Sequence, residues 1–337
     1  MQIREGDLVQ IQNKIIFDVK GLIHPPDRVV AYPRFVPDPH GNHKRDNTKF
    51  RKIYALSERY KLLDEEFPQY LVYDPIFDEL LCEVWKKDIQ YHYNPVDRLI
   101  KLRDSSQLDQ LEADALRVVE HLQTCSGVSS NKLGITGSLL AHLHTQKSDL
   151  DLIIYGKKAC RQIYNTLKSA MKEKSRMIRP YKLEELKILY DFRSTDTKIP
   201  FKDFVRTERR KILQGKSLQH DFYIRCLKDW GEIKECYGDT LYKKAGYAKI
   251  KAQVVDASEA IFTPCNYSVD KVQVLEGKLK GKVTAISSFR GRFCEQARSG
   301  ETVIAQGKVE RVQRKSGETF NRLLLGSKPA DFMALKG

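Results

Sequence analysis

The sequence predicts an α+β protein in which a mixed sheet with flanking helices lies between two β-rich parts. Three observations lead to this class. Short runs of alternating apolar and polar residues occur near both ends of the chain. The middle contains a strand, a Gly-Ser turn, a short helix and a second strand in close succession. Before that succession, between residues 106 and 124, apolar residues recur at helical spacing.

The first part, residues 1–103, is expected to be β-rich with a helical segment. The entry to its third strand is expected to be set by Pro25-Pro26 and its exit by Pro33 and Pro37, because proline cannot donate a hydrogen bond to a sheet. Residues 50–100 are expected to be mixed and mainly helical. The expected strands cover residues 7–12, 14–21 and 29–32.

The middle part, residues 104–240, is expected to form the central mixed sheet and its helices. A helix should begin near Ser106, which could form a capping box with Asp109. The patterns that follow predict a strand at 132–136, a short helix at 137–143, a strand at 150–155, helices at 157–174, 181–192 and 200–214, and a strand at 218–226.

The last part, residues 241–337, has the pattern of a small β-barrel, because short alternating strands recur at even spacing with glycines between them. The expected strands cover residues 249–255, 271–275, 281–286, 301–310 and 319–325. This part also gathers basic residues around two aromatic ones: Lys278, Lys280, Lys282, Arg290, Arg292 and Arg298, with Phe289 and Phe293. Such a surface suits single-stranded nucleic acid, and a docking or dimerisation module is the alternative.

Composition favours a polyanionic partner. The 337 residues carry a formal charge of +15, which suits nucleic acid, although solubility or adaptation to a charged cytosol would also account for it. The seven cysteines are scattered and form no Cys-x-x-Cys pair, which argues against a disulfide framework and a structural zinc site. The sequence shows neither a signal peptide nor a membrane-spanning run of about 20 apolar residues, so we expect a cytoplasmic protein.

The most informative stretch contains Gly137-Ser138 and, ten residues later, Asp149-Leu-Asp151-Leu. Alternate side chains of a strand share a face, so the two carboxylates should point the same way, about 7 Å apart along the backbone. Convergent carboxylates suit magnesium ions that lie between a protein and a triphosphate. Gly137 would let the backbone approach phosphates, and the Ser138 hydroxyl could donate to one.

This stretch resembles the signature of the DNA polymerase beta nucleotidyltransferase superfamily, in which Gly-Gly or Gly-Ser precedes a strand with paired aspartates. The flanking parts look like an uncharacterised, mainly archaeal group of predicted nucleotidyltransferases. The resemblance covers residues 105–230 and implies a nucleotidyltransferase-like sheet and a nucleoside triphosphate substrate. It also implies two Mg²⁺ ions as cofactor, with Mn²⁺ as a possible substitute.

The resemblance further implies a third carboxylate on a neighbouring strand, and Asp221 is the best candidate. Its competitors are Asp191, Asp196 and Asp203, none of which stands in a clear strand. The metal ligands and catalytic residues would then be Asp149, Asp151 and Asp221. The expected nucleotide-binding residues are Gly137, Ser138, Lys157, Arg209 and Arg210.

The expected reaction is transfer of a nucleoside monophosphate from a nucleoside triphosphate to an acceptor hydroxyl, with release of pyrophosphate. The charge favours an acceptor at the end of an RNA or DNA chain. Two alternatives stay open at this point: a transferase that nucleotidylates protein, as a toxin or regulator, and a catalytically inactive nucleic-acid-binding protein. Neither the base, nor template dependence, nor the oligomeric state follows from the sequence.

Overall fold

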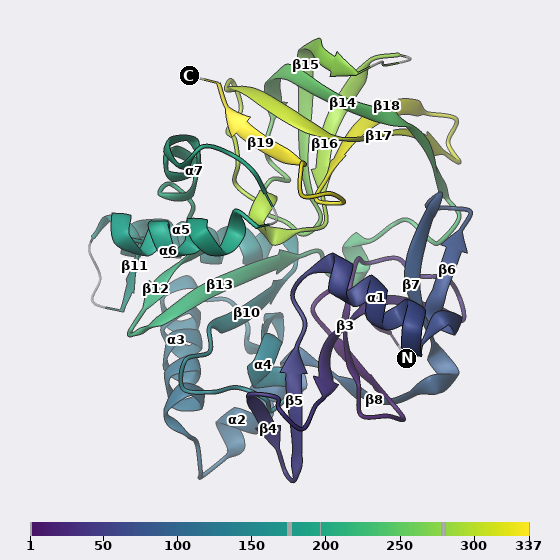
Figure 1. Ribbon diagram of the computed structural model, residues 1–337. Coiled ribbons are helices and arrows are strands. Elements are labelled where there is room, and N and C mark those ends of the chain that lie inside the picture. Colours follow the sequence, from purple (N-terminus) through teal and green to yellow (C-terminus); the bar gives the residue numbers. More distant parts are fainter. Residues whose placement is uncertain (1, 174–176, 196, 278, 280, 337) are drawn as a thin grey trace. The chain divides into compact units, whose positions relative to one another are not determined.

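The computed structural model describes residues 2–173, 177–195, 197–277, 279 and 281–336. The fold is α+β, as predicted, with three separate β-sheets and seven α-helices in the described chain (Figure 1). It divides into two compact units. The first unit comprises residues 1–73, 80–179 and 213–234, and the second comprises 74–79, 180–212 and 235–337.

This division differs from the three consecutive parts expected from the sequence. The N-terminal sheet and the central sheet pack into one unit, and residues 180–212 belong with the C-terminal strands. Contacts between distant parts of the chain decide such a division, and a pass along the sequence does not detect them.

In the first unit, the N-terminal strands form a sheet in the order β4-β5-β3-β2-β1-β8, and β7 joins β3 to β6. Its elements are β1 (Leu8–Ile11), β2 (Ile16–Val19), β3 (Arg28–Pro37), β4 (His43–Arg45), β5 (Thr48–Lys52), α1 (Leu56–Glu66), β6 (Leu71–Asp74), β7 (Glu79–Trp85) and β8 (Ile89–Tyr93). The mainly helical character expected for residues 50–100 is therefore wrong, because three strands follow α1.

Strand β3 continues through Pro33 and ends at Pro37, the second of the two prolines expected to close it. Pro33 pairs with Phe17 and Phe35 pairs with Ile16, so the register shifts and Arg34 is the extra residue at the irregular step. A bulge of this kind accommodates a proline without breaking the strand.

The central sheet of the first unit has the order β11-β12-β13-β10-β9, with β10 and β13 parallel and the other pairs antiparallel. Helix α5 packs against β10 and β13, and α3 packs against α5. The elements are α2 (Pro95–Asp104), α3 (Gln110–Ser126), β9 (Leu133–Ile135), α4 (Gly137–Leu140), β10 (Leu150–Tyr155), α5 (Lys157–Lys172), β11 (Ile178–Arg179), β12 (Gln214–Ser217) and β13 (His220–Leu227).

Helix α3 begins later than expected, because Asp109 and not Ser106 is its N-cap. The Asp109 side chain accepts a hydrogen bond from the Glu112 backbone at 2.9 Å, and the Glu112 side chain accepts one from the Asp109 backbone at 3.2 Å. This capping box satisfies two backbone donors of the first turn. The helix ends at Gly127, which adopts φ of 68°.

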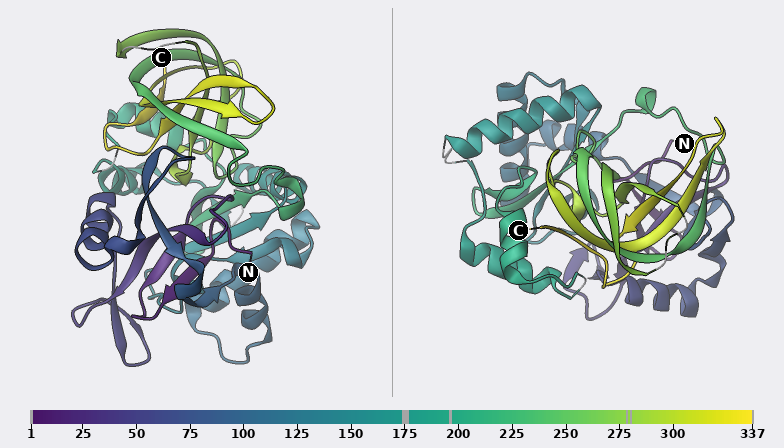
Figure 2. Two further views of the ribbon diagram at one scale, coloured as in Figure 1. Left: turned by 90° about the vertical axis from the view of Figure 1, so that its right-hand side faces the viewer. Right: turned by 90° about the horizontal axis from the view of Figure 1, so that it is seen from above.

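In the second unit, the strand pairs β14–β15, β15–β16, β16–β18, β18–β17 and β17–β14 return to their starting strand, so the sheet is barrel-like (Figure 2). The elements are α6 (Leu183–Arg193), α7 (Phe201–Glu208), β14 (Thr240–Asp256), β15 (Cys265–Gly277), β16 (Val283–Ser288), β17 (Thr302–Arg314), β18 (Thr319–Leu325) and β19 (Phe332–Leu335). The sequence predicted every strand of this sheet except β19.

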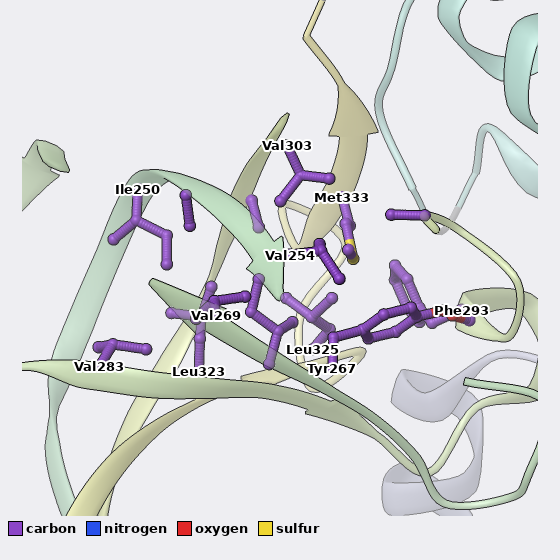
Figure 3. Packing of buried hydrophobic residues seen from close by; sticks show 14 of the residues in the cluster. Ile250, Val254, Tyr267, Val269, Val283, Phe293, Val303, Leu323, Leu325 and Met333 are labelled. Carbon is purple, nitrogen blue, oxygen red and sulfur yellow. Dashed lines mark hydrogen bonds between the residues drawn. The ribbon is translucent and has the colours of Figure 1, made fainter. Parts of the chain in front are cut away.

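Apolar residues from all six strands fill the interior of this sheet (Figure 3). Phe293 lies among them and is only 1% exposed, so its expected role as a surface for stacking bases is wrong. Lys278 and Lys280 lie outside the described residues. Among the helices of the described chain, none combines the length and the apolar composition needed to cross a membrane.

One buried tyrosine offers a test of this core. The Tyr267 hydroxyl donates to the Phe293 carbonyl at 2.6 Å and accepts a hydrogen bond from the Gln296 backbone at 2.9 Å. We expect Tyr267→Phe to lower the free energy of unfolding by about 1–3 kcal/mol, because both backbone groups lose their partner in a buried place. Urea denaturation followed by circular dichroism measures this change.

The matched control is Tyr91→Phe, which removes a hydroxyl from a side chain in a residue that is 47% exposed. It should change the free energy of unfolding by less than about 0.5 kcal/mol. Equal losses in the two variants would contradict the assignment of a structural role to the Tyr267 hydroxyl.

Candidate active site

The candidate site begins where β9 turns into α4 beside the start of β10. The Thr136 backbone donates to the Asp151 carbonyl at 2.9 Å, continuing the antiparallel pairing of β9 with β10. The next residue, Gly137, adopts φ of 67°. A Cβ at this position would stand 2.2 Å from Oδ2 of Asp151, so only glycine leaves room for that carboxylate.

The parallel pairing of β10 with β13 brings the third carboxylate to the same place. Leu150 pairs with Phe222 and Asp151 pairs with Tyr223, so the preceding residues, Asp149 and Asp221, stand at matching positions. Since side chains alternate along a strand, Asp149, Asp151 and Asp221 share one face of the sheet. Asp149 is exposed, and the other two are partly exposed.

The three carboxylates influence one another electrostatically. Although Asp149 is exposed, the surrounding protein partly desolvates its carboxylate, and this desolvation, together with repulsion from Asp151 and Asp221, raises the pKa of Asp149 to about 6. The positive charges of Lys52 and Lys216 oppose this rise. Lys216 also donates to Asp221 at 2.9 Å. A concentration of negative charge that remains accessible to solvent is a suitable place for a hard cation.

Arg225 supplies a further positive charge on the same face of β13. Its guanidinium donates to Glu5 at 2.5 Å. Burial of the guanidinium alone would lower the pKa of Arg225. The negative charges of Glu5 and Asp18 outweigh that effect and raise this pKa, and Asp151 adds a smaller contribution. The site is therefore joined to the N-terminal strands through a buried ion pair.

The oxygens of the three aspartates are not gathered around one point. A different cluster in the described chain, formed by Asp109, Glu112 and His144, has three potential metal-ligand atoms that all lie within 4.8 Å of one another. The capping box of α3 accounts for its two carboxylates, and His144 Nε2 lies 2.6 Å from Asp109. This cluster is thus explained by helix capping.

The structure brings together Gly137, Ser138, Asp149, Asp151 and Asp221 from the residues that the sequence singled out. Ser138 is only 2% exposed, however, which does not favour a direct contact between its hydroxyl and a phosphate. The competitors Asp191 and Asp203 lie in α6 and α7 of the second unit, and Asp196 lies outside the described residues.

Of the basic residues expected to bind nucleotide, only Lys157 belongs to the same unit as β10. Lys157 follows the opposite end of the strand, on the order of 20 Å from Asp151 at the usual rise per residue. Arg209 and Arg210 belong to the second unit. There the Arg210 guanidinium binds both carboxylate oxygens of Glu301, at 2.7 and 2.5 Å. The cations whose charges act on Asp149 are Lys52 and Lys216 instead.

Lys52 and Arg225 had no signal in the sequence. Lys52 precedes Asp149 by almost one hundred residues, and its relation to the site depends on how β5 packs. Arg225 belongs to a strand that the pattern did predict, but its pairing with Glu5 joins residues 220 positions apart.

The second unit has a separate basic pocket of about 340 Å³, lined by Arg206, Lys251, Glu301, Thr302, Leu335 and Lys336. The ammonium of Lys336 lies beside that of Lys251. This contact and the repulsion between the two positive charges lower the pKa of Lys251. Two adjacent ammonium groups are relieved when an anion binds between them. This pocket therefore suits phosphate or another anion.

Comparison with known proteins gives one informative relative. The chain is 29% identical over 335 residues to a Methanocaldococcus jannaschii protein described as "Uncharacterized protein MJ1086", covering 97% of this chain and 96% of that one. The similarity spans both units, but the description assigns no activity. No family model matches the chain. No solved structure matches it either.

Two glycines allow a test of the close approach at Gly137. Gly127 has φ of 68°, nearly the value of Gly137, but a Cβ there would meet nothing within 4 Å. We expect Gly127→Ala to lower the free energy of unfolding by about 1 kcal/mol, the cost of left-handed backbone for alanine. Gly137→Ala should cost about 1–3 kcal/mol more, because the new methyl group displaces Asp151. Equal losses, measured by urea denaturation, would argue against the contact.

The raised pKa of Asp149 predicts a pH dependence in the presence of chelator. The folded protein should bind a proton between about pH 4 and 6 that the unfolded chain does not, so stability falls as pH rises through this window. Asp149→Asn should therefore gain stability relative to wild type, by about 1 kcal/mol at pH 7 once solvent screening is allowed for, and little at pH 4. Thermal unfolding across this range measures the difference.

Asp109→Asn provides a control of opposite sign. Desolvation alone would raise the pKa of Asp109. Hydrogen bonds from the Glu112 backbone and from His144 outweigh it and hold this pKa below its ordinary value. Asparagine also caps helices, so mainly the charge is removed. This variant should be less stable than wild type above about pH 4, and the difference should shrink as pH falls below that value. The same pH trend in both variants would refute the assigned environment of Asp149.

Proposed function

We propose that the protein is a divalent-cation-dependent nucleotidyltransferase that transfers a nucleoside monophosphate to an acceptor hydroxyl. The observation that carries this proposal is the meeting of Asp149, Asp151 and Asp221 on one face of two parallel strands, next to the close contact of Gly137 with Asp151. Enzymes of this reaction type position phosphates and neutralise charge, and they need little covalent chemistry from the protein.

The order of elements supports the proposal. Strand β9, the Gly137-Ser138 turn, helix α4, strand β10, helix α5 and strand β13 follow the arrangement expected from the resemblance to the DNA polymerase beta superfamily. The parallel pairing of β10 with β13 supports Asp221 as the third carboxylate, because it brings Asp221 beside Asp149.

The three aspartates suit Mg²⁺ or Mn²⁺, because these ions prefer carboxylate oxygens and keep some of their water ligands. Repulsion between the aspartates, which contributes to the raised pKa of Asp149, would be relieved by a bound cation. Asp149, Asp151 and Asp221 would hold the ions. When bound, such ions neutralise the triphosphate and lower the pKa of the attacking hydroxyl.

The remaining steps concern the chain and its substrates. The acceptor oxygen forms a bond to the α-phosphorus, the bond from that phosphorus to the bridging oxygen breaks, and pyrophosphate leaves with the electron pair. The hydroxyl proton passes to a carboxylate of the site or to water. Gly137 leaves room for the Asp151 carboxylate, because it has no Cβ. Lys216 orients Asp221 by donating a hydrogen bond to its carboxylate.

The preferred acceptor is the end of a nucleic acid. The formal charge of +15 and the basic pocket of the second unit both suit a polyanion. The proposed place of action is the cytoplasm, in keeping with seven free cysteines.

Incorporation of α-labelled nucleoside triphosphates tests the proposal. Each base is offered in turn, with Mg²⁺ or Mn²⁺, to total RNA, a DNA primer and a cell extract. Asp149→Ala, Asp151→Ala and Asp221→Ala should each reduce incorporation at least about a hundredfold, because each removes a cation ligand.

Asp191→Ala and Asp203→Ala are the matched controls and should keep most of the activity. Label in a nucleic acid that depends on Asp149, Asp151 and Asp221 would support the proposal and identify the acceptor. Label in a protein band would instead favour protein nucleotidylation. Salt-sensitive binding of nucleic acid without incorporation would favour a catalytically inactive binding protein.

A further inference from the structure

The N-terminal sheet brings strand β5 to the edge of the candidate site. Phe50 packs in a buried cluster with Leu140 and Ala141, which follow Gly137-Ser138 closely in the chain. The preceding hairpin strand β4 is also fixed there. His43 Nδ1 hydrogen-bonds to the Leu143 carbonyl at 2.6 Å, and the Arg45 guanidinium donates to the Ala141 carbonyl at 3.0 Å.

Lys52 lies two residues beyond Phe50 and therefore on the same face of β5. Because Phe50 packs against Leu140 of α4, Lys52 lies on the face of β5 that is turned toward the candidate site. The electrostatics agree, since the charge of Lys52 is the larger of two positive contributions that oppose the raised pKa of Asp149.

Two cations and an exposed aromatic ring form a cluster at this edge. The Lys52 ammonium lies 5.0 Å from the centre of the Tyr54 ring, and the Arg34 guanidinium lies 4.7 Å from the same centre. Tyr54 is 48% exposed, so part of its ring is accessible to a ligand. Arg34 also donates to the Ile53 carbonyl at 3.1 Å, which fixes its position.

The charges of Arg34 and Lys52 are not neutralised by a direct partner. Within the described residues, neither forms an ion pair with a carboxylate. Neighbouring cations differ, since Arg51 pairs with Asp38 and Arg225 pairs with Glu5. Arg34 acts on Asp18 electrostatically but does not pair with it, so both cations can still bind an anionic ligand, and the exposed part of the Tyr54 ring suits a flat one.

We propose that Arg34, Lys52 and Tyr54 form a nucleotide-binding site beside the carboxylates, in which the two cations bind phosphate and the Tyr54 ring stacks on the base. Aromatic rings accept any base by stacking, and lysine and arginine bind phosphate through charge-assisted hydrogen bonds. The inference rests on the proposed function for the reaction at Asp149. The nucleotide is either the incoming triphosphate or the terminal residue of the acceptor.

Equilibrium binding tests the site without requiring turnover. The probes are a nucleoside triphosphate with a methylene bridge between its α- and β-phosphorus atoms and a short fluorescent oligoribonucleotide, each with Mg²⁺. The variants are Arg34→Gln, Lys52→Gln and Tyr54→Leu. Lys49→Gln is the matched control, because Lys49 is exposed on the opposite face of the same strand. Lys52→Arg and Tyr54→Phe preserve the charge and the ring.

We expect Arg34→Gln and Lys52→Gln each to weaken binding of one probe about tenfold or more, since each removes a charged hydrogen-bond donor. Tyr54→Leu should weaken it about fivefold or more. Lys49→Gln, Lys52→Arg and Tyr54→Phe should stay within about twofold to threefold of wild type. Loss confined to the triphosphate assigns the site to the incoming nucleotide, and loss confined to the oligoribonucleotide assigns it to the acceptor.

Unchanged affinity for both probes in folded Arg34→Gln and Lys52→Gln proteins, or equal losses in Lys49→Gln, would overturn the inference. Thermal unfolding identifies variants that do not fold, and the conservative variants then decide. The proposed function is judged separately. Incorporation that depends on Asp149 would stand even if this site failed, and nucleotide binding that depends on Lys52 would stand even if no incorporation occurred.

Discussion

The contact between Gly137 and the Asp151 carboxylate is the constraint on which the candidate site depends. No side chain fits between them, because even a Cβ would stand 2.2 Å from the carboxylate oxygen. The residue before Gly137 also binds Asp151, because the Thr136 backbone donates a hydrogen bond to the Asp151 carbonyl. The start of β10 is therefore determined by its neighbour, and with it the positions of Asp149 and Asp151.

From this start, strand pairing and charge explain the rest of the site. The parallel register of β10 and β13 places Asp221 beside Asp149, and the resulting repulsion raises the pKa of Asp149. Lys216 and Lys52 offset part of that repulsion from two different sheets. Since the offset is incomplete, ionised Asp149 carries an electrostatic cost that a bound cation would remove. This imbalance is what separates the site from an ordinary surface group of aspartates.

The sequence predicted what depends on neighbouring residues. Strands β9, β10 and β13, helix α5 and the turn at Gly137 all follow from apolar periodicity and from the residues that end each element. The strands β6, β7 and β8 were missed, because each is short and because β7 and β8 complete the sheet by pairing with β3 and β1, which lie far earlier in the chain. Closeness in sequence to Asp151 favours Lys157 as a nucleotide-binding residue. Lys52, by contrast, influences the pKa of Asp149 because another sheet brings its charge near the site.

The N-terminal strands are therefore part of the site and cannot be treated as an attached module. The Thr136 hydroxyl donates to the Gly6 carbonyl at 2.6 Å, and a Cβ at Gly6 would stand 2.2 Å from the Ile153 side chain. Glu5 pairs with Arg225 in the centre of the same interface. These contacts join the first residues of the chain to the central sheet, including the strand that carries Asp151. Whatever reaction the carboxylates support takes place on a surface to which both sheets contribute.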